Sequence, residues 1–182
     1  MTPHCLILPG YGDSGPQHWQ SRWQQDTHFE RVEQTDWIHA ERTAWVAALE
    51  GAVQRNADRQ LWLVAHSLGC LTVAFWAAEH PLTQVQGALL VAPPDPNGDQ
   101  FPASVRGFNP VPAQWLPFPS TVVMSTNDPY AKPAFAEQCA TQWGSHLVNL
   151  GDCGHINHDS GLDDWPEGRA LLQALMEPSP RS

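Results

Sequence analysis

Ser67, Asp128 and His155 are the three residues whose types and order along the chain could build an activated nucleophile. A serine hydroxyl attacks a carbonyl carbon when an imidazole takes its proton, and a carboxylate orients that imidazole and stabilises its charge. Each of the three follows a short apolar run, in the segments LVAHSLGC, STNDPY and GDCGHINHDS. This pattern predicts a nucleophile, an acid and a base that meet in the folded chain.

Ser67 also has the local setting of a nucleophile elbow, a sharp strand-to-helix turn with the pattern G-x-S-x-G. It follows the apolar run 61–65 and precedes CLTVAFWAA, which has a helical pattern, and Gly69 lies two residues further on. Ala65 replaces the first glycine of the pattern, and its small side chain tightens the turn without forbidding it. The alternative interpretation is that Ser67 only caps the helix.

The acid and the base have alternative interpretations as well. Asp128 precedes a proline, where aspartate commonly forms an Asx-turn, and His155 follows a glycine in a turn-like stretch. Asp95 and Asp152 also lie near predicted strand ends and could orient the histidine instead. We predict that Asp128 is the acid, which gives the chain order serine, acid, histidine.

A glycine-rich segment, LPGYGDSGPQHW, follows the first apolar run and is expected at the same edge of the sheet. An oxyanion hole usually combines the N–H after the nucleophile with one from the loop after an early strand. Here those two donors are predicted to be the backbone N–H groups of Leu68 and Tyr11. A phosphate-binding loop is the alternative: GYGDSG at residues 10–15 has the GxGxxG spacing, but GxxxxGK[ST] does not occur in the segment.

A second group of residues, Asp152, His155, His158 and Asp159, resembles a metal-binding cluster. Its spacing differs from the HExxH zinc motif, and no further ligand group supports it. We therefore predict no metal and no other cofactor, with His158 and Asp159 as loop or surface residues. The cysteines lack CxxC spacing and are predicted to be reduced thiols: Cys5, Cys70, Cys139 and Cys153.

Short apolar runs predict the strands that must position these side chains: 5–8, 61–65, 87–92, 121–124 and 146–150, with a weaker strand at 29–33. Helical patterns lie between them, and this alternation predicts an α/β fold with a mostly parallel sheet of about six strands flanked by helices. The runs are typical of strands buried on both faces. Because the carboxyl ends of parallel strands share one edge, the three candidate residues are expected to converge there.

The chain has 182 residues, 42% of them hydrophobic, which predicts a single domain over residues 1–182. One long irregular segment, 93–119, holds eight of the 17 prolines and is predicted to be a lid or wall beside the site. The last residues, 177–182, are predicted to form a flexible tail.

Nine tryptophans are many for a chain of this size, so several are expected outside the core. Trp19, Trp115 and Trp165 fall in segments near the predicted edge, and Trp19 and Trp165 are the candidates for substrate binding. The alternative for each is packing against a helix or against segment 93–119, since large aromatic side chains mostly bury against something.

The charge balance limits the partners of the protein. Lys and Arg total 9 against 19 Asp and Glu, for a net charge of −10, and no basic cluster offers a site for nucleic acid. No apolar run approaches the roughly 18 residues that span a membrane, and no charged leader opens the chain. These features predict a soluble, cytoplasmic protein without a nucleic-acid or membrane partner.

Four segments together, LILPGYGDSGPQHWQSRW, LVAHSLGC, STNDPY and GHINHDSGLDDWPEG, resemble the small serine hydrolases related to retinoblastoma-binding protein nine and the YdeN-type bacterial proteins. The resemblance spans almost the whole chain. It implies a compact α/β-hydrolase fold without a large cap domain, with Ser67 as nucleophile, Asp128 as acid and His155 as base. Ala65 stands where many relatives have glycine. This difference bears on the geometry of the elbow and not on the identity of the three residues.

The residues and the resemblance together predict a serine hydrolase, a carboxylesterase that acts on small-molecule esters with short acyl chains through an acyl-enzyme. Amide substrates are the less favoured variant. Two alternatives stay open: a non-catalytic protein that binds a protein or peptide partner with the same fold, and an enzyme in which the same residues serve acyl transfer or perhydrolysis.

Overall fold

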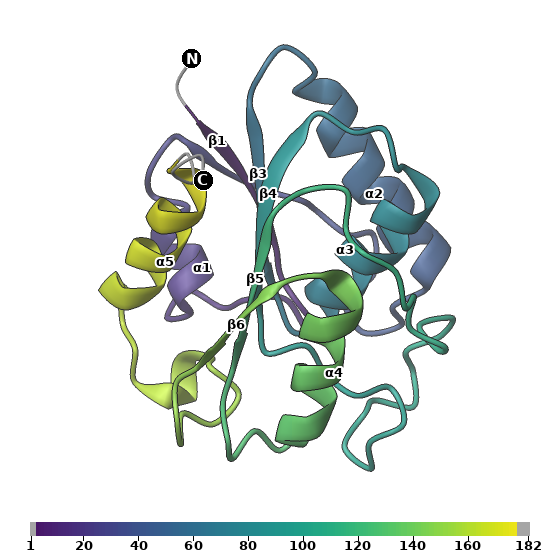
Figure 1. Cartoon of the computed structure of the whole chain (residues 1–182), viewed down its shortest axis with the longest axis vertical. Helices are drawn as coiled ribbons and strands as arrows, with labels where there is room; N and C mark the ends of the chain where they lie inside the picture. The colour runs from purple at the N-terminus through teal and green to yellow at the C-terminus, as the bar shows by residue number, and fades with distance from the viewer. Residues whose placement is uncertain (1–2, 178–182) are drawn as a thin grey trace.

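Six short strands form the centre of the molecule, and all of them are parallel (Figure 1). The computed structural model describes residues 3–177. The strand order is β2-β1-β3-β4-β5-β6. The strands are β1 (His4–Leu8), β2 (Phe29–Arg31), β3 (Leu61–His66), β4 (Val85–Val91), β5 (Ser120–Met124) and β6 (His146–Asn149). The predicted α/β fold is confirmed, and the sheet is entirely rather than mostly parallel.

The inner strands are apolar because helices cover both faces of the sheet. Every residue of β1, β3 and β5 is buried, and so is every residue of β4 except Gln86. The edge strands differ from the prediction. β6 is only half-buried, since no strand lies beyond it, and β2 is shorter than the predicted run 29–33.

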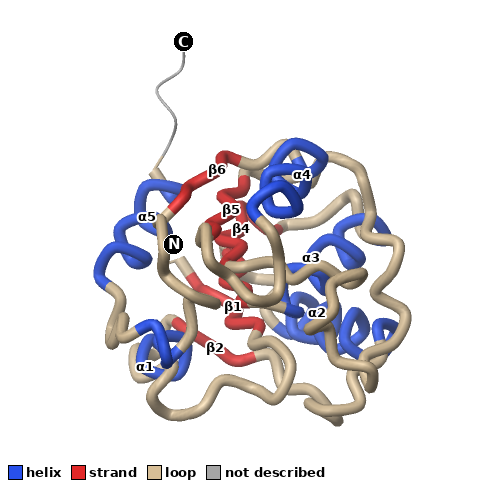
Figure 2. Tube along the Cα trace, turned by 90° about the horizontal axis from the view of Figure 1, so that it is seen from below, coloured by secondary structure: helices blue, strands red, loops and turns tan. Residues whose placement is uncertain are grey.

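The helices form two layers. α2 (Arg42–Arg55), α3 (Leu68–Glu79) and α4 (Pro133–Trp143) cover one face, whereas α1 (Trp19–Trp23) and α5 (Pro166–Met176) cover the other (Figures 1 and 2). α3 is apolar on nearly all sides because it is enclosed between the sheet and α2. α4 begins at a proline in its first turn and ends at Gly144, whose φ of 67° is the left-handed conformation that favours glycine.

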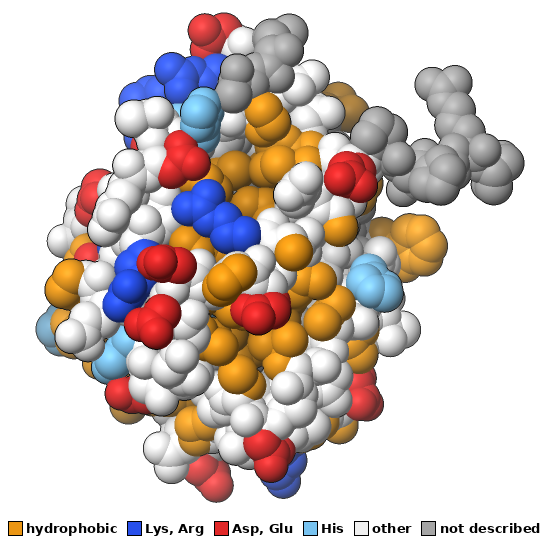
Figure 3. Space-filling model, turned by 90° about the vertical axis from the view of Figure 1, so that its left-hand side faces the viewer, with side chains coloured by type: hydrophobic (Ala, Val, Ile, Leu, Met, Phe, Trp, Pro, Cys, Tyr) orange, Lys and Arg blue, Asp and Glu red, His pale blue; other side chains and the backbone are white. Residues whose placement is uncertain are grey.

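The outer surface over α1 and α5 mixes apolar and charged side chains (Figure 3). On this face the Lys and Arg side chains lie in small groups interspersed with acidic ones, so they form no continuous basic patch. Within residues 3–177, no helix combines the length and the apolar character that crossing a bilayer requires.

Segment 93–119 joins β4 to β5 without a helix or strand of its own, as its prolines predict. Two backbone hydrogen bonds join it to the start of α2. The Arg106 N–H donates to the carbonyl oxygen of Ala40 at 2.9 Å, and the Arg106 carbonyl oxygen accepts the N–H of Arg42 at 3.1 Å. Phe108, Leu116 and Phe118 anchor it in the core. The segment is therefore a wall packed over α2 and α3.

The cysteines are unpaired among the described residues, as predicted, and three of the four are buried. Burial raises the pKa of Cys5 and of Cys139 to about 12. Of the predicted tail, Glu177 follows α5, and 178–182 lie outside the described residues.

The strand order places a switch point between β1 and β3. From β1 the chain continues to β2 on one side, and from β3 it continues to β4 on the other. Loops that leave two such strands diverge over the carboxyl edge of the sheet and form a crevice there. The glycine-rich segment after β1 and the elbow after β3 meet at this crevice, which is the place of the candidate site.

Candidate active site

Ser67 forms the predicted elbow between β3 and α3. Its φ of 54° and ψ of −125° are sparsely populated by residues with a side chain, which is typical of this turn. Gly69 permits the close approach of the helix to β1, since a Cβ there would lie 2.3 Å from the carbonyl oxygen of Leu8. Ala65 is fully buried in β3 and leaves the turn intact. Ser67 makes no side-chain cap bond, so the helix-cap interpretation is wrong.

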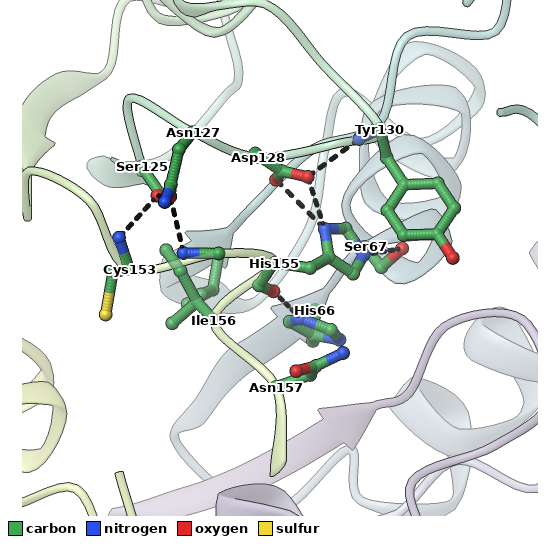
Figure 4. A network of polar contacts seen from close by, with 12 residues as sticks. His66, Ser67, Ser125, Asn127, Asp128, Tyr130, Cys153, His155, Ile156 and Asn157 are labelled. Atoms are coloured by element: carbon green, nitrogen blue, oxygen red, sulfur yellow. Dashed lines mark hydrogen bonds and ion pairs between the residues drawn. The ribbon is translucent and has the colours of Figure 1, made fainter. Parts of the chain in front are cut away.

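The three predicted side chains are brought together by hydrogen bonds (Figure 4). His155 Nε2 lies 2.9 Å from Ser67 Oγ, and His155 Nδ1 lies 2.9 Å from each carboxylate oxygen of Asp128. With the proton on Nδ1, the imidazole donates to Asp128 and accepts from the Ser67 hydroxyl. The side chains of His155 and Asp128 are 9% and 4% exposed, so water screens these contacts little.

Asp128 combines the two interpretations that its sequence allowed. Its Oδ1 accepts the backbone N–H of Tyr130 at 2.9 Å, which is the Asx-turn, and the same carboxylate contacts His155. The turn fixes the carboxylate toward the imidazole. The other acids are engaged elsewhere, since Asp95 accepts from the N–H of Asn97 and Asp152 from the Thr126 hydroxyl.

Polar side chains at the end of β5 hold the loop that carries His155. Asn127 Oδ1 accepts the N–H of Gly154 at 2.7 Å and the hydroxyl of Ser125 at 2.9 Å. The Ser125 oxygen in turn accepts the N–H of Cys153 at 2.9 Å (Figure 4). These bonds satisfy two backbone donors just before the histidine and fix the loop against the strand end that bears the acid.

His66, which directly precedes Ser67, fixes the same loop from the other side. Its Nε2–H donates to the carbonyl oxygen of His155 at 2.8 Å (Figure 4). Complete burial, the nearby His18 and the His155 ring together hold the pKa of His66 well below its usual value, so the ring stays neutral. The His155 ring lies between Tyr130 and His66, with centroid distances of 4.4 and 4.9 Å.

The glycine-rich segment passes directly over the elbow. A Cβ at Gly10 would lie 2.7 Å from the Cβ of Ser67 and 3.2 Å from the nitrogen of Leu68, so only glycine fits. Leu68 begins α3, and its N–H is therefore one of the unpaired donors of a first helical turn. In the part of the chain that the structure describes, the N–H groups of Leu68 and Tyr11 have no intramolecular acceptor. Both residues line the cavity at Ser67.

The cavity has a volume of about 460 Å³. The glycine-rich segment forms one side, and Phe101, Pro102 and Val105 of segment 93–119 form another. Ser67, His155 and Tyr130 also line it, so the Ser67 side chain lies beside a space that can hold a small molecule.

A model of the serine hydrolase family matches residues 5–174, which is almost the whole described chain. The chain belongs to the serine hydrolase family. No curated protein sequence matches it. This membership confirms the resemblance on which the sequence prediction relied, and the solved structures agree with it.

Several solved structures share the fold of this serine hydrolase. A YdeN-like hydrolase from Pectobacterium atrosepticum is 28% identical with a TM-score of 0.82, covering 96% of this chain and 90% of that one. The ydeN gene product of B. subtilis is 20% identical with a TM-score of 0.70, covering 96% and 99%. Est1E from Butyrivibrio proteoclasticus, solved with ferulic acid bound, is 13% identical with a TM-score of 0.69, covering 97% and 90%.

The prediction for two tryptophans of the serine hydrolase must be corrected. Trp19 and Trp165 are each 1% exposed and lie outside the cavity, so their predicted substrate-binding role is wrong. Their rings pack together at 4.9 Å between α1 and α5, and Trp19 Nε1–H donates to the carbonyl of Ile156 at 2.9 Å. Trp19 thereby joins α1 to the loop of His155. Trp115 is 77% exposed and packs against Gly144.

The apparent metal-binding cluster is not assembled as one. Among residues 3–177, no group of three or more His, Cys, Asp or Glu side chains is placed to hold a metal ion. Both ring nitrogens of His155 are engaged with the serine and the aspartate, and His158 pairs with Asp159 at the surface.

The serine hydrolase also places residues at the cavity that the sequence analysis missed: His18, His66, Tyr130 and Asn157. Two of them had a signal. His66 is adjacent to the nucleophile, and His18 belongs to the same glycine-rich segment as the predicted donor Tyr11. Asn157 lies two residues after His155, but nothing in the sequence distinguishes it from an ordinary loop residue.

Proposed function

We propose that this protein is a carboxylesterase that cleaves small esters with short acyl chains through an acyl-enzyme on Ser67. The single observation that carries the proposal is the chain of hydrogen bonds from Ser67 through His155 to Asp128. Its Ser67 end lies at the cavity. A serine in a strained elbow with its hydroxyl on an imidazole is prepared for attack on a carbonyl.

In the first half of the cycle, Ser67 Oγ forms a bond to the ester carbonyl carbon while its proton moves to His155 Nε2. The carbonyl electron pair moves onto oxygen, and the N–H groups of Leu68 and Tyr11 stabilise that charge. When the carbonyl reforms, the bond to the alcohol oxygen breaks and His155 gives its proton to the leaving alcohol. Asp128 holds the Nδ1–H and stabilises the imidazolium between the two transfers.

In the second half, water replaces the alcohol. His155 Nε2 takes a proton from water as its oxygen attacks the acyl carbon, and the returning electron pair expels Ser67, which regains its proton. Over the whole cycle, one ester and one water give a carboxylic acid and an alcohol.

Short acyl chains follow from the walls of the cavity. Segment 93–119 covers α2 and α3 with buried side chains and closes one side with Phe101 and Pro102. We expect p-nitrophenyl acetate and butanoate to have higher kcat/KM values than the octanoate, and a preference for octanoate would contradict this part of the proposal.

The decisive experiment is labelling with a fluorophosphonate probe, which bonds to an activated serine. We expect the wild type to be labelled and Ser67→Ala and His155→Ala to lose labelling, with ester turnover lost in parallel. A folded wild type that neither labels nor hydrolyses esters would contradict the proposal and favour the non-catalytic binding protein. Transfer of the acyl group to added alcohols in preference to water would favour acyl transfer.

A further inference from the structure

His18 is a buried histidine on the wall of the cavity, and the proposed chemistry does not use it. Its side chain caps the first turn of α1, where Nδ1 accepts the backbone N–H of Gln20 at 3.1 Å. A nitrogen that accepts a hydrogen bond carries no proton, so the proton of this neutral ring is on Nε2. The cap therefore fixes the tautomer.

The Nε2–H of His18 has no partner within residues 3–177. The atom is buried, and no side-chain or backbone oxygen of the described chain accepts from it. Burial, followed by the nearby rings of His158 and His155 and by Arg31, lowers the pKa of His18 to about 3, so the ring is neutral at working pH. A buried donor without an acceptor destabilises the folded protein, and a ligand oxygen that accepts from it removes that cost.

The position of this donor relates it to the nucleophile. The His18 ring contacts the edge of the His66 ring at a centroid distance of 4.7 Å, and His66 directly precedes Ser67. Both rings and Ser67 line the same cavity. A small molecule that places its carbonyl at Ser67 therefore has further atoms within the space that His18 lines.

The charges around the cavity favour a neutral rather than an anionic substrate oxygen as the acceptor for His18. No Lys or Arg lines it among the described residues, and Asp13, the acid at its wall, is paired with Arg31. A carboxylate or phosphate would therefore lose its hydration without gaining a cation. A neutral oxygen loses less hydration free energy when it enters the cavity and can still accept a hydrogen bond.

We propose that His18 is a substrate-binding residue whose Nε2–H donates to a neutral oxygen of the substrate, an ether, hydroxyl or second carbonyl near the scissile ester. This inference rests on the proposed esterase function and narrows its substrate class. The protein then favours oxygen-bearing short esters over alkyl esters of the same length.

Two substitutions separate the donor of His18 from its cap. His18→Asn keeps an acceptor at the place of Nδ1 and lacks the Nε2 donor, whereas His18→Gln carries a donor at the place of Nε2 and loses the cap. The Asn variant is therefore the test, and the Gln variant is its control. If His18→Asn does not fold, His18→Ser replaces it, because serine also caps a helix and also lacks the donor.

Pairs of esters with equal numbers of heavy atoms supply the readout. On the acyl side, p-nitrophenyl methoxyacetate is compared with the butanoate, and the 3-methoxypropanoate with the pentanoate. On the alcohol side, 2-methoxyethyl acetate is compared with butyl acetate. The two esters of a pair differ in intrinsic reactivity. For each protein we therefore take the ratio of kcat/KM for the oxygen-bearing ester to kcat/KM for the alkyl ester. Intrinsic reactivity cancels when this ratio for the wild type is compared with that for the variant.

We expect His18→Asn to lower the oxygen-to-alkyl ratio about tenfold for at least one pair, and His18→Gln to keep the ratio of the wild type. Unchanged ratios in all three pairs for a folded His18→Asn would overturn the inference while ester hydrolysis stands. An equal loss of ratio in both variants would assign the effect to the shape of the imidazole ring, which both lack, and would also overturn the inference. A wild type without ester hydrolysis would overturn the proposed function and this inference together.

Discussion

At the scale of single residues, the candidate site is a set of hydrogen bonds in which each member fixes the next. Asp128 is held by the Tyr130 N–H, His155 by Asp128 and by its own carbonyl, and Ser67 by its elbow. Groups fixed in this way need little reorganisation during a reaction. The effect of a substitution should therefore depend on which bond it removes.

Asp128→Asn tests the orientation of the base. The amide oxygen can still accept the Tyr130 N–H, so we expect the fold to persist, but the amide holds the wrong tautomer of His155. We expect kcat for a p-nitrophenyl ester to fall on the order of 10⁴-fold. A variant that retains more than about a tenth of the wild-type rate would contradict the assignment of the acid.

His66→Phe tests whether His66 acts as a positioning residue. The variant loses the donor to the His155 carbonyl and leaves that buried oxygen without its partner. We expect kcat to fall by up to about 100-fold with little change in KM, because a displaced base affects the chemical step rather than binding.

The matched variant for this prediction is His66→Gln, which carries an N–H donor at a similar reach. We expect it to recover a large part of kcat. Equal losses in the Phe and Gln variants, or a loss confined to KM, would mean that the ring acts only by filling space.

The meeting of Ser67, Asp128 and His155 was predictable from the sequence because each of them follows its own apolar run, and parallel strands bring such positions to one edge. His18 and His66 were not singled out. A histidine beside a nucleophile or in a glycine-rich turn has no pattern that indicates burial, and the bonds that give each ring a role come from residues distant in sequence or from a helix cap.

At the scale of elements, the site depends on how closely β1, β3 and α3 approach one another. Gly10 and Gly69 lie where a Cβ would collide with backbone or with Ser67 itself. The two glycines allow the segment after β1 to lie over the elbow, which places the Leu68 and Tyr11 N–H groups on one cavity.

Gly69→Ala should therefore lower the free energy of unfolding by more than about 2 kcal/mol, because the methyl group would lie 2.3 Å from the Leu8 oxygen. The control is Gly51→Ala in α2, where the methyl group would meet only the flexible end of Arg55 at 3.4 Å. There we expect a gain of about 0.5–1 kcal/mol, since alanine favours a helix interior. Urea unfolding measures both, and a neutral Gly69→Ala would contradict the packing argument.

The elements that the sequence predicted best are the buried ones. Continuous apolar runs set β1, β3, β4 and β5 within two residues, but β6 was predicted to be buried on both faces although its position at the edge leaves it half-exposed. The position of a strand in the sheet is set by topology, which its own residues do not encode. The five residues of α1 are too few to show a helical period.

At the scale of the whole molecule, buried neutral histidines couple the fold to pH. His18 has a folded pKa of about 3 against 6.5 in a free side chain, and the pKa of His66 is also lowered. Below pH 6.5 the unfolded chain binds protons that the folded chain excludes, so this contribution is complete above that value and is lost as pH falls toward 3.

We expect the wild type to lose about 2–3 kcal/mol more unfolding free energy than His18→Asn between pH 7 and pH 4.5, because asparagine does not titrate. Urea unfolding at several pH values gives the two slopes. His39→Asn is the control, since that side chain is 76% exposed, and its slope should follow the wild type. Parallel curves for the wild type and His18→Asn would show that folding does not lower the pKa of His18.

The contact between Trp19 and the Ile156 carbonyl has a consequence for how the protein is made. Trp23 bonds in the same way to the carbonyl of Asp164, so two indoles near the start of the chain find their acceptors more than a hundred residues later. During translation these indole N–H groups are left without their native acceptors until residues 156–165 emerge from the ribosome.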